Sequence, residues 1–360
     1  MARSVFGIGI AAGTQCAFGI AVFMVGSLTA CSNTVPTSSA PENQAENPSK
    51  EPVTLTLVTY AVTRDAYEKI IPKFVEHWKA KTGQEVTFEQ SYGGSGSQTR
   101  AVIDGLEADV VALALESDVA KIEEVGLIQP NWQAETPNQS IVTKSVIAFV
   151  PRKADTKLAN WSDLASQNLK VITANPKTSG GARWNFLGLW GAITQTGGTP
   201  EQAQTYVETI YKNAPVLPKD AREATDVFYQ QGQGDVLLNY ENEVILAKQK
   251  GKKQPYIVPT DYNISIDAPV AVVDSNVDKK GTRTVAEAFT QYLFTPDAQK
   301  LFAESGFRPV DATVAEEFKA QYPPVKKLVT IADFGGWQKV QTKFFEDGGI
   351  FDKILTNIGK

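Results

Sequence analysis

The sequence predicts an α/β protein made of two lobes, each a mostly parallel sheet flanked by helices. After residue 52, short apolar runs alternate with amphipathic stretches to the end of the chain, as expected when helices cover both faces of a parallel sheet. The alternation runs through two successive series, and about 310 residues are available for them, which is enough for two medium lobes. In such sheets ligands bind beyond the carboxyl ends of the strands, so we expect the site in the cleft between the lobes.

The first 31 residues have the features of an export signal. Arg3 precedes a long apolar stretch, and small residues lead to Leu28-Thr29-Ala30-Cys31; these are features of a secretory signal peptide. The last four residues resemble the lipobox of bacterial lipoproteins, in which the cysteine is lipidated and becomes the new N-terminus. We therefore expect lipidation of Cys31 and a periplasmic location. The alternative is an uncleaved signal anchor, since the apolar stretch is long enough to span a bilayer.

Residues 32–52 predict a disordered tether. They are rich in Pro, Ser, Asn and Glu and almost devoid of apolar residues, so they cannot bury enough surface to offset the entropy of ordering. No later segment has about 18 consecutive apolar residues. We therefore expect the body to contact the membrane only through its N-terminal anchor.

Composition excludes several classes of function. The net charge is −5, so no basic excess predicts binding to nucleic acid. Both cysteines, Cys16 and Cys31, lie in the leading segment, and His77 is the single histidine. The folded part therefore has no disulfide, no thiol nucleophile and no two-histidine metal set. We expect no cofactor, no metal and no enzymatic activity.

In the first series, strands are predicted at continuous apolar runs and helices where apolar residues recur at helical spacing. The run 108–115 shows little alternation, as expected for a strand buried on both faces. The predicted strands are 53–59, 84–90, 108–115 and 145–150, and the predicted helices are 65–81, 98–106 and 118–125.

The second series follows the same rules. Its predicted strands are 171–173, 214–217, 235–240, 256–259 and 268–273. Its predicted helices are 161–165, 182–195, 201–212, 220–231, 241–250, 279–294, 297–305, 337–345 and 350–357. We expect one lobe from residues 53–147 plus 262–312, a second from 148–261, and a C-terminal helical segment, 313–360, that packs on the lobes. The crossovers near 145–150 and 256–267 would form the hinge.

Four strand-to-helix turns share one chemistry. They are 59–64, 93–96, 178–181 and 219–222, and each places hydroxyls or free main-chain N–H groups at the start of a helix. These groups lack partners inside the helix and lie at the positive end of its dipole, which favours anion binding. Each turn alone is equally consistent with ordinary turn chemistry. If all four converge on the cleft, they form a shell of neutral donors.

A shell made only of hydrogen-bond donors distinguishes anions by whether they carry a proton. Burying a dianion is very unfavourable unless each oxygen gains hydrogen bonds. Sulfate carries no proton near neutral pH, whereas phosphate often does, and that proton would face a donor and find no acceptor. The unpaired group makes the difference in affinity large. The shell therefore predicts a fully ionised tetrahedral oxyanion.

From Val53 to the C-terminus the chain resembles the periplasmic sulfate-binding proteins of ABC importers. Two segments carry most of the likeness, namely 79–91 leading into Gly93-Gly94-Ser95-Gly96, and Asn175-Pro-Lys-Thr-Ser-Gly-Gly-Ala-Arg183. Shorter matches are 107–111, 234–237, 241–243 and 334–337. The resemblance implies a two-lobed periplasmic-binding-protein type II fold that binds sulfate, with thiosulfate as a second candidate, and delivers it to membrane permease subunits of an ABC importer. It implies a monomer.

The resemblance also implies roles for single residues. Hydroxyl donors would be Ser95 and Ser179, and main-chain N–H donors would be Ala61, Gly180, Gly181 and Ala221. Ala61 stands where the family often has aspartate, and Tyr240 stands where the best-known pattern has a tryptophan donor, so the Tyr240 contact is a departure. Arg64, Arg183 and Arg222 are expected to support the shell by bridging the lobes or pairing with carboxylates.

Two alternatives stay open at this stage. Molybdate and tungstate are also tetrahedral dianions, and a protein of the same class could bind them. An exported ester hydrolase would need a nucleophile such as Ser95, but residue 97 is serine where a Gly-x-Ser-x-Gly elbow needs glycine, and no histidine lies nearby.

Overall fold

The structure is a computed structural model that describes residues 51–166 and 168–360. The signal segment, Cys31 and most of the tether lie outside the described residues. Two sheets organise the described part, one of five strands and one of three. We call the part built on the five-stranded sheet lobe 1 and the part built on the three-stranded sheet lobe 2; the exact lobe boundaries predicted above stay predictions.

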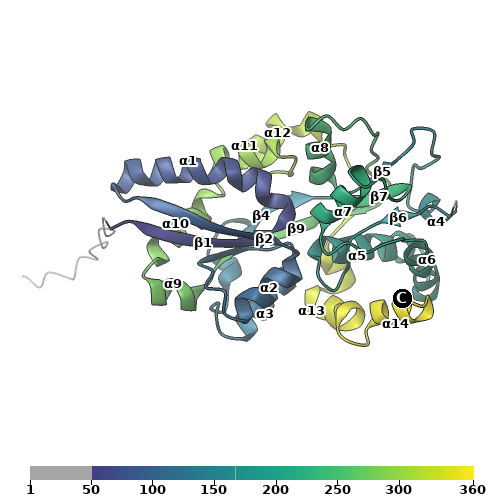
Figure 1. Cartoon of the computed structure of the whole chain (residues 1–360), viewed down its shortest axis with the longest axis horizontal. Coiled ribbons are helices and arrows are strands. Elements are labelled where there is room, and N and C mark those ends of the chain that lie inside the picture. Colours follow the sequence, from purple (N-terminus) through teal and green to yellow (C-terminus); the bar gives the residue numbers. More distant parts are fainter. Residues whose placement is uncertain (1–50, 167) are drawn as a thin grey trace, which may run out of the picture. The chain divides into compact units, whose positions relative to one another are not determined.

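Lobe 1 contains strands in the order β2-β1-β3-β9-β4. Strand β1 pairs in parallel with β2 and β3, whereas β9 is antiparallel to both β3 and β4. Figure 1 shows α1 along one face of this sheet and α2 and α3 beyond the other. The strands are β1 (Val53–Tyr60), β2 (Val86–Gly93), β3 (Val110–Ala112), β4 (Ile141–Ser145) and β9 (Ile266–Val272).

Lobe 2 contains strands in the order β5-β7-β6, with β7 antiparallel to β5 and parallel to β6. These strands are β5 (Ile147–Pro151), β6 (Val171–Ile172) and β7 (Val236–Tyr240). Both sheets are therefore mixed rather than mostly parallel. The antiparallel pairs arise where the chain passes from one lobe to the other and back, because a strand that arrives from the other lobe enters its sheet in the opposite direction.

The chain crosses between the sheets at two adjacent points. Strand β4 ends at Ser145 and β5 begins at Ile147, so one residue separates the two sheets. The return passes from β8 (Asn263–Ile264) to β9, again across one residue. Asn263 joins the two crossovers, because its side chain accepts a hydrogen bond from Ile147 N at 3.1 Å and donates one to Ile147 O at 2.9 Å.

The helices nearest lobe 1 are α1 (Arg64–Thr82), α2 (Ser95–Ile103), α3 (Glu116–Glu124), α9 (Asp274–Lys280), α10 (Arg283–Tyr292), α11 (Pro296–Glu304) and α12 (Ala312–Glu317). Those nearest lobe 2 are α4 (Asp163–Ser166), α5 (Gly180–Thr194), α6 (Pro200–Lys212), α7 (Ala221–Tyr229), α8 (Glu241–Gln249), α13 (Trp337–Val340) and α14 (Ile350–Asn357). The last two helices lie beside α5 and α6 (Figure 1). Strand β10 (Leu328–Val329) pairs with β8, and η1 (Ala61–Thr63) is a short 3-10 turn before α1.

Several predicted elements differ from the structure. Residues 214–217 form no strand, and 256–259 contribute only an isolated bridge between Ile257 and Phe149. The predicted helix 279–294 is two helices, because Gly281 at φ +69° ends α9. The predicted helix 337–345 continues from α13 into a π-helical turn at residues 341–345. Short apolar runs alone do not distinguish a strand from buried irregular chain.

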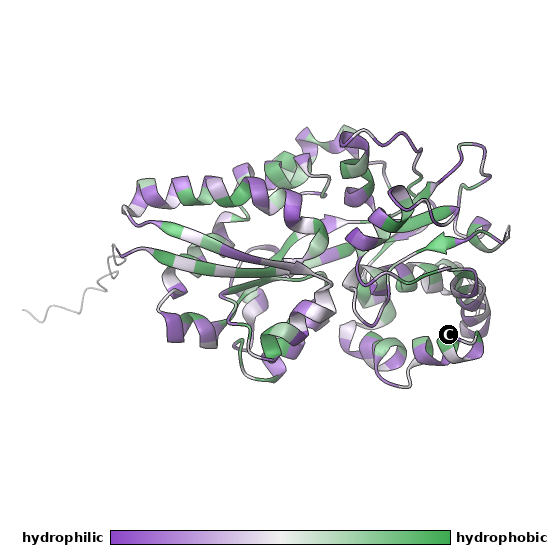
Figure 2. Ribbon diagram, in the orientation of Figure 1, coloured by the Kyte–Doolittle hydropathy of each residue, from purple (hydrophilic) through white to green (hydrophobic). Residues whose placement is uncertain are grey.

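Helix α5 forms the centre of lobe 2. All but its last residues are buried, so most of its apolar residues are spread around the helix rather than gathered on one face, and Arg183 and Asn185 are its buried polar residues. Figure 2 shows the strands of both sheets coloured as hydrophobic over much of their length, whereas α1 alternates between the two colours. Within the described residues, no helix combines the length and apolar character needed to cross a membrane.

Candidate anion-binding site

A small cavity lies where the strands of the two sheets end. Strands β1, β2 and β7 finish at its edge with Tyr60, Gly93 and Tyr240. About 10 Å³ is available there to the centre of a water molecule, which is about the space of one water molecule and excludes an organic ligand. Its lining consists of Tyr60, Ala61, Val62, Gly93, Gly94, Ser95, Ala114, Ser179, Gly180, Gly181, Asp220, Ala221 and Tyr240. The structure thus brings all seven predicted ligand-binding residues together around one cavity.

Free main-chain N–H groups surround this cavity at the starts of helices. Gly180 and Gly181 occupy the first two positions of α5, and Ala221 occupies the first position of α7. N–H groups at these positions have no acceptor in their own helix, and within the described part of the chain no other acceptor is in hydrogen-bond range of them. The positive ends of both helix dipoles therefore point their N–H groups toward the cavity.

The two serines differ in their present hydrogen bonds. The Ser179 oxygen accepts from Ala182 N at 3.2 Å as the N-cap of α5, so its proton is free to be donated. The Ser95 hydroxyl accepts from Ala114 N at 3.0 Å and donates to Asp118 Oδ2 at 2.7 Å. Its proton therefore points to a carboxylate in this structure, and it must rotate before it can donate into the cavity.

Tyr240 supplies a third hydroxyl. The side chain is 2% exposed, and its hydroxyl has no hydrogen-bond partner within the described residues. Burial raises the pKa of Tyr240 well above that of free tyrosine, so it stays a neutral donor. An unpaired buried hydroxyl is unfavourable by about 1–3 kcal/mol, and a ligand oxygen in the cavity would remove that penalty.

Glycines allow the two lobes to approach at the cavity. A Cβ atom on Gly94 of lobe 1 would lie 2.5 Å from Thr178 O of lobe 2. A Cβ on Gly180 would lie 2.7 Å from the Ala114 Cβ. Within lobe 2, a Cβ on Gly181 would lie 2.5 Å from Tyr240 Cε2. Each distance is shorter than real Cβ contacts, so these positions require glycine for packing, and the lobes are closed on each other.

Arg183 joins the lobes behind the cavity. Its Nη1 lies 2.7 Å from Asp118 Oδ1, and both side chains are almost fully buried. Its Nε donates to Pro176 O at 2.9 Å in the turn that leads to Ser179. Because the same carboxylate accepts from Ser95, Asp118 connects a cavity residue of lobe 1 to a helix of lobe 2.

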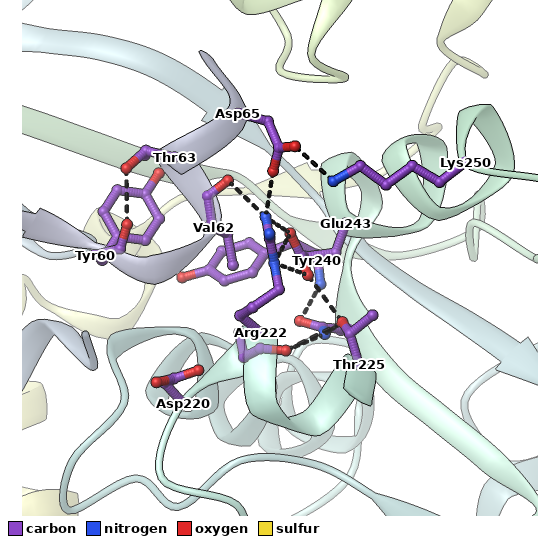
Figure 3. A network of polar contacts seen from close by, with 12 residues as sticks. Tyr60, Val62, Thr63, Asp65, Asp220, Arg222, Thr225, Tyr240, Glu243 and Lys250 are labelled. Atoms are coloured by element: carbon purple, nitrogen blue, oxygen red, sulfur yellow. Dashed lines mark hydrogen bonds and ion pairs between the residues drawn. The ribbon is translucent and has the colours of Figure 1, made fainter. Parts of the chain in front are cut away.

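Arg222 joins the lobes on the other side (Figure 3). Its Nη2 donates to Glu243 Oε1 at 2.8 Å and to Asp65 Oδ2 at 3.0 Å. Lys250 Nζ lies 2.5 Å from the other oxygen of Asp65. Helices α7 and α8 of lobe 2 thus hold α1 of lobe 1 through two cations and two carboxylates.

All residues that line the cavity are among the described residues, and none of them has a cationic side chain. Arg64 lies over the Tyr92 ring at 4.1 Å from the ring centre. Asp220 is the one charged residue in the lining, and its carboxylate accepts from Glu223 N at 2.8 Å. The donors that face the cavity are therefore neutral, and the positive charges are one layer further out. Such a site can bind an anion, but it contains no histidine or cysteine that could act as a nucleophile or base.

Comparison with known proteins assigns the family. The model of the family described as bacterial extracellular solute-binding protein matches residues 55–308. The chain belongs to this family. Its solved relatives include the sulfate-binding protein SubI of Mycobacterium tuberculosis H37Rv, at 37% identity and a TM-score of 0.74 over 81% of this chain and 99% of that one.

Sequence relatives of this solute-binding protein carry two kinds of name. It is 66% identical to the sulfate-binding protein of Synechocystis sp. over the full length of both chains. It is 38% identical to the thiosulfate-binding protein of Pseudomonas aeruginosa over 83% of this chain and 91% of the relative. The predicted family and the predicted two-lobed fold class are confirmed.

Sequence reasoning missed the carboxylates that organise this site. Asp118, Glu243 and Asp65 fix the arginines that flank the donor turns, yet no motif marks any of them as an ion-pair partner; only Glu243 falls within a short match to the family, 241–243. One signal was present, since Arg64, Arg183 and Arg222 each adjoin a donor turn and a buried arginine requires an anionic partner. The sequence does not predict which carboxylate pairs with each arginine, because the partners of Arg183 and Arg222 are 21 to 157 residues away in the chain.

Protonation of Asp65 is expected to weaken the contact between the lobes. Burial raises the pKa of Asp65, but Lys250 and Arg222 outweigh burial and hold the pKa below its usual value. A lowered pKa stabilises the folded protein fully above the ordinary value of about 4, and the contribution is lost as the pH falls through the lowered pKa. We expect Asp65→Asn to lower the free energy of unfolding at neutral pH by about 1 kcal/mol or less.

Urea unfolding between about pH 3 and pH 7 checks this expectation. Below about pH 4, the free energy of unfolding of the Asp65→Asn variant should fall less steeply with pH than that of the unchanged protein. Asp261→Asn is the matched control, because Asp261 pairs with Lys326 on an open surface, where both side chains are more than three-quarters exposed. Identical declines for all three proteins would contradict the role given to Asp65.

Proposed function

We propose that this solute-binding protein captures sulfate outside the cytoplasm and delivers it to the permease of an ABC importer. One observation carries the proposal, namely a small cavity between the lobes that is ringed by neutral donors at helix starts. The sulfate-binding proteins among its relatives support the same ligand. The protein acts as a binding module and performs no reaction on the ion.

Each lobe supplies some of the hydrogen-bond donors. Ala61 N–H and the Ser95 hydroxyl act from lobe 1, after rotation of Ser95 away from Asp118. Ser179, Gly180, Gly181, Ala221 and Tyr240 act from lobe 2. Because each lobe supplies donors, the ion is fully bound only when the lobes close, which is the usual motion of such proteins. Arg64, Arg183 and Arg222 support the donor turns without contacting the ion.

Sulfate suits this cavity better than phosphate for a chemical reason. Near neutral pH a proton on phosphate would meet N–H groups or hydroxyls that donate to the ion, and the one carboxylate in the lining, Asp220, caps α7, where its Oδ1 accepts from Glu223 N at 2.8 Å. An unmatched proton in a buried site is costly. We therefore expect sulfate to bind at least about 100-fold more tightly than phosphate.

Isothermal titration calorimetry with a chain that begins at Val53 tests the proposal. Sulfate should bind with a one-to-one stoichiometry, and phosphate should fail to displace it at equal concentration. Absence of binding at millimolar sulfate would overturn the proposal. Competition with molybdate and tungstate tests the larger dianions, which we expect to bind more weakly because the cavity is small.

Thiosulfate is the second candidate ligand. The thiosulfate-binding relative is 38% identical to this chain over the aligned residues, and the two ions have the same charge. Thiosulfate replaces one oxygen with a larger sulfur that accepts hydrogen bonds more weakly. We expect it to bind this cavity less tightly than sulfate, and the same calorimetric competition measures the ratio.

The proposal extends to the N-terminus and to assembly. Lipidation of Cys31 would tether the protein to the membrane, and its body would act as a monomer on the periplasmic side. Mass spectrometry of the mature N-terminus tests the anchor, since a diacylglycerol mass on Cys31 supports it and an intact leader overturns it. The hinge for closure would lie at the crossovers beside Val146 and Ser265.

A further inference from the structure

A lysine-rich surface follows helix α8. Residues 248–253 contain Lys248, Lys250, Lys252 and Lys253, and all four are exposed. No acidic residue occurs between Glu243 and Asp261. We call residues 248–253 the lysine segment. It is a strong local positive charge on a protein whose net charge is −5, and the proposed anion site does not use it.

Most of this charge is uncompensated. Lys250 forms an ion pair with Asp65, whereas no ion pair is found for Lys248, Lys252 or Lys253 within the described ranges. Lys248 lies over the Tyr256 ring at 5.9 Å and Lys252 over the Tyr229 ring at 5.6 Å. Contact with aromatic rings holds ammonium groups in place without neutralising them. These two lysines are therefore oriented cations that can still attract an anionic partner.

The lysines border a hollow in the surface. About 530 Å³ is available there, lined by Lys248, Lys252, Lys253, Gln254, Pro255 and Tyr256. The lining contains three cations, two apolar or aromatic surfaces and no carboxylate. A hollow of this composition fits carboxylate side chains that project from a protein surface.

Helix α8 connects this surface to lobe closure. It belongs to lobe 2 but contacts lobe 1 at both ends. At its start Glu241 pairs with Arg308 at 2.7 Å, and Gln249 near its end donates to Glu304 O at 3.0 Å. The ion pair between Lys250 and Asp65 adds a third contact. In this closed arrangement the lysine segment is therefore held in place against lobe 1.

We propose that the lysine segment docks an acidic periplasmic surface of the permease, and that it does so in the closed, ion-loaded state. The inference rests on the proposed function, since it assigns the surface through which the captured ion is delivered. A permease must distinguish the closed protein from the open one, and a charged surface whose placement depends on closure provides that distinction. Complementary charges of this kind mainly raise the rate and specificity of association.

The experiment compares two triple variants of the full chain in proteoliposomes. The vesicles carry the sulfate permease complex of Synechocystis, the organism of the 66% identical relative. Lys248→Glu/Lys252→Glu/Lys253→Glu reverses the charge of the segment and leaves Lys250 in place. Lys81→Glu/Lys153→Glu/Lys339→Glu makes the same change of net charge at exposed lysines elsewhere. Sulfate-stimulated ATP hydrolysis and calorimetric sulfate affinity are measured for both.

We expect the segment variant to require at least about tenfold more protein for half-maximal ATP hydrolysis, while its sulfate affinity stays within twofold. The control variant should match the unchanged protein in both measurements. Equal stimulation by all three proteins would overturn the inference. Failure of the unchanged protein to bind sulfate in calorimetry would instead overturn the proposed function.

Two further outcomes would also overturn the inference. If the segment variant stimulates ATP hydrolysis normally but binds sulfate more slowly in stopped-flow mixing, the lysines attract the ion rather than the permease. If the unchanged protein lacking residues 1–52 co-sediments with phosphatidylglycerol vesicles free of permease and the segment variant does not, the surface binds anionic lipid.

Discussion

Replacing Gly94 with alanine is expected to lower sulfate affinity by about 100-fold, or about 2.7 kcal/mol. The new Cβ would lie 2.5 Å from Thr178 O and 3.1 Å from Lys219 O. Both are main-chain atoms of lobe 2, so no side-chain rotation can relieve the clash. The lobes would have to stay apart, and donors of lobe 1 and lobe 2 could no longer contact one ion together.

Folding of the Gly94→Ala variant should be nearly normal. Gly94 has φ −63° and ψ 134°, which alanine adopts without strain. Gly93→Ala is the matched control, since its Cβ would meet the Gln98 side chain at an ordinary 3.6 Å. Calorimetry measures affinity, and thermal unfolding without sulfate measures stability. Unchanged affinity in Gly94→Ala would contradict the closed arrangement of the lobes.

Replacing Tyr240 with phenylalanine should lower sulfate affinity by about 10- to 100-fold, because one hydrogen bond to a charged ligand contributes about 1.5–3 kcal/mol. The same change should leave the ion-free protein equally or more stable. The hydroxyl that it removes is buried and unpaired, so its loss removes an unfavourable group rather than an interaction. Affinity and stability would thus move in opposite directions, which simple damage to the fold would not produce.

Tyr211→Phe provides a matched control for this substitution. The Tyr211 hydroxyl is also buried and unpaired within the described residues, but Tyr211 packs in the core of lobe 2 against Phe186 and Phe351. Its replacement should leave sulfate affinity unchanged. Equal affinity in Tyr240→Phe and the unchanged protein would remove Tyr240 from the donor shell.

The donor turns are predictable from the sequence because their chemistry is local. A strand followed by Gly or Ser and then a helix determines where free N–H groups lie, whatever the rest of the chain does. The residues at 93–96, 178–181 and 219–222 therefore predict free donors at helix starts, and anion binding follows only if the turns converge. The resemblance to sulfate-binding proteins adds the expectation that all turns meet at one cavity.

Features that depend on distant residues were not predictable. The partnership of Asp118 with both Ser95 and Arg183 joins three helices and two lobes, and no periodicity encodes it. The antiparallel pairs of β9 and β5 depend on how the chain crosses between the lobes. The predicted strand at 214–217 was wrong because a short apolar run has no sheet partner to pair with there.

A crystal structure of the chain from Val53 to the C-terminus with bound sulfate most directly tests the central claim, which is that neutral donors bind the ion. We predict one sulfate in the cavity between the lobes, within hydrogen-bond distance of Gly180 N, Gly181 N, Ala221 N and the Tyr240 hydroxyl, with no lysine or arginine nitrogen touching it. Sulfate held at that position by the side chain of Arg183 or Arg222, or bound only outside the cavity, would contradict recognition by neutral donors.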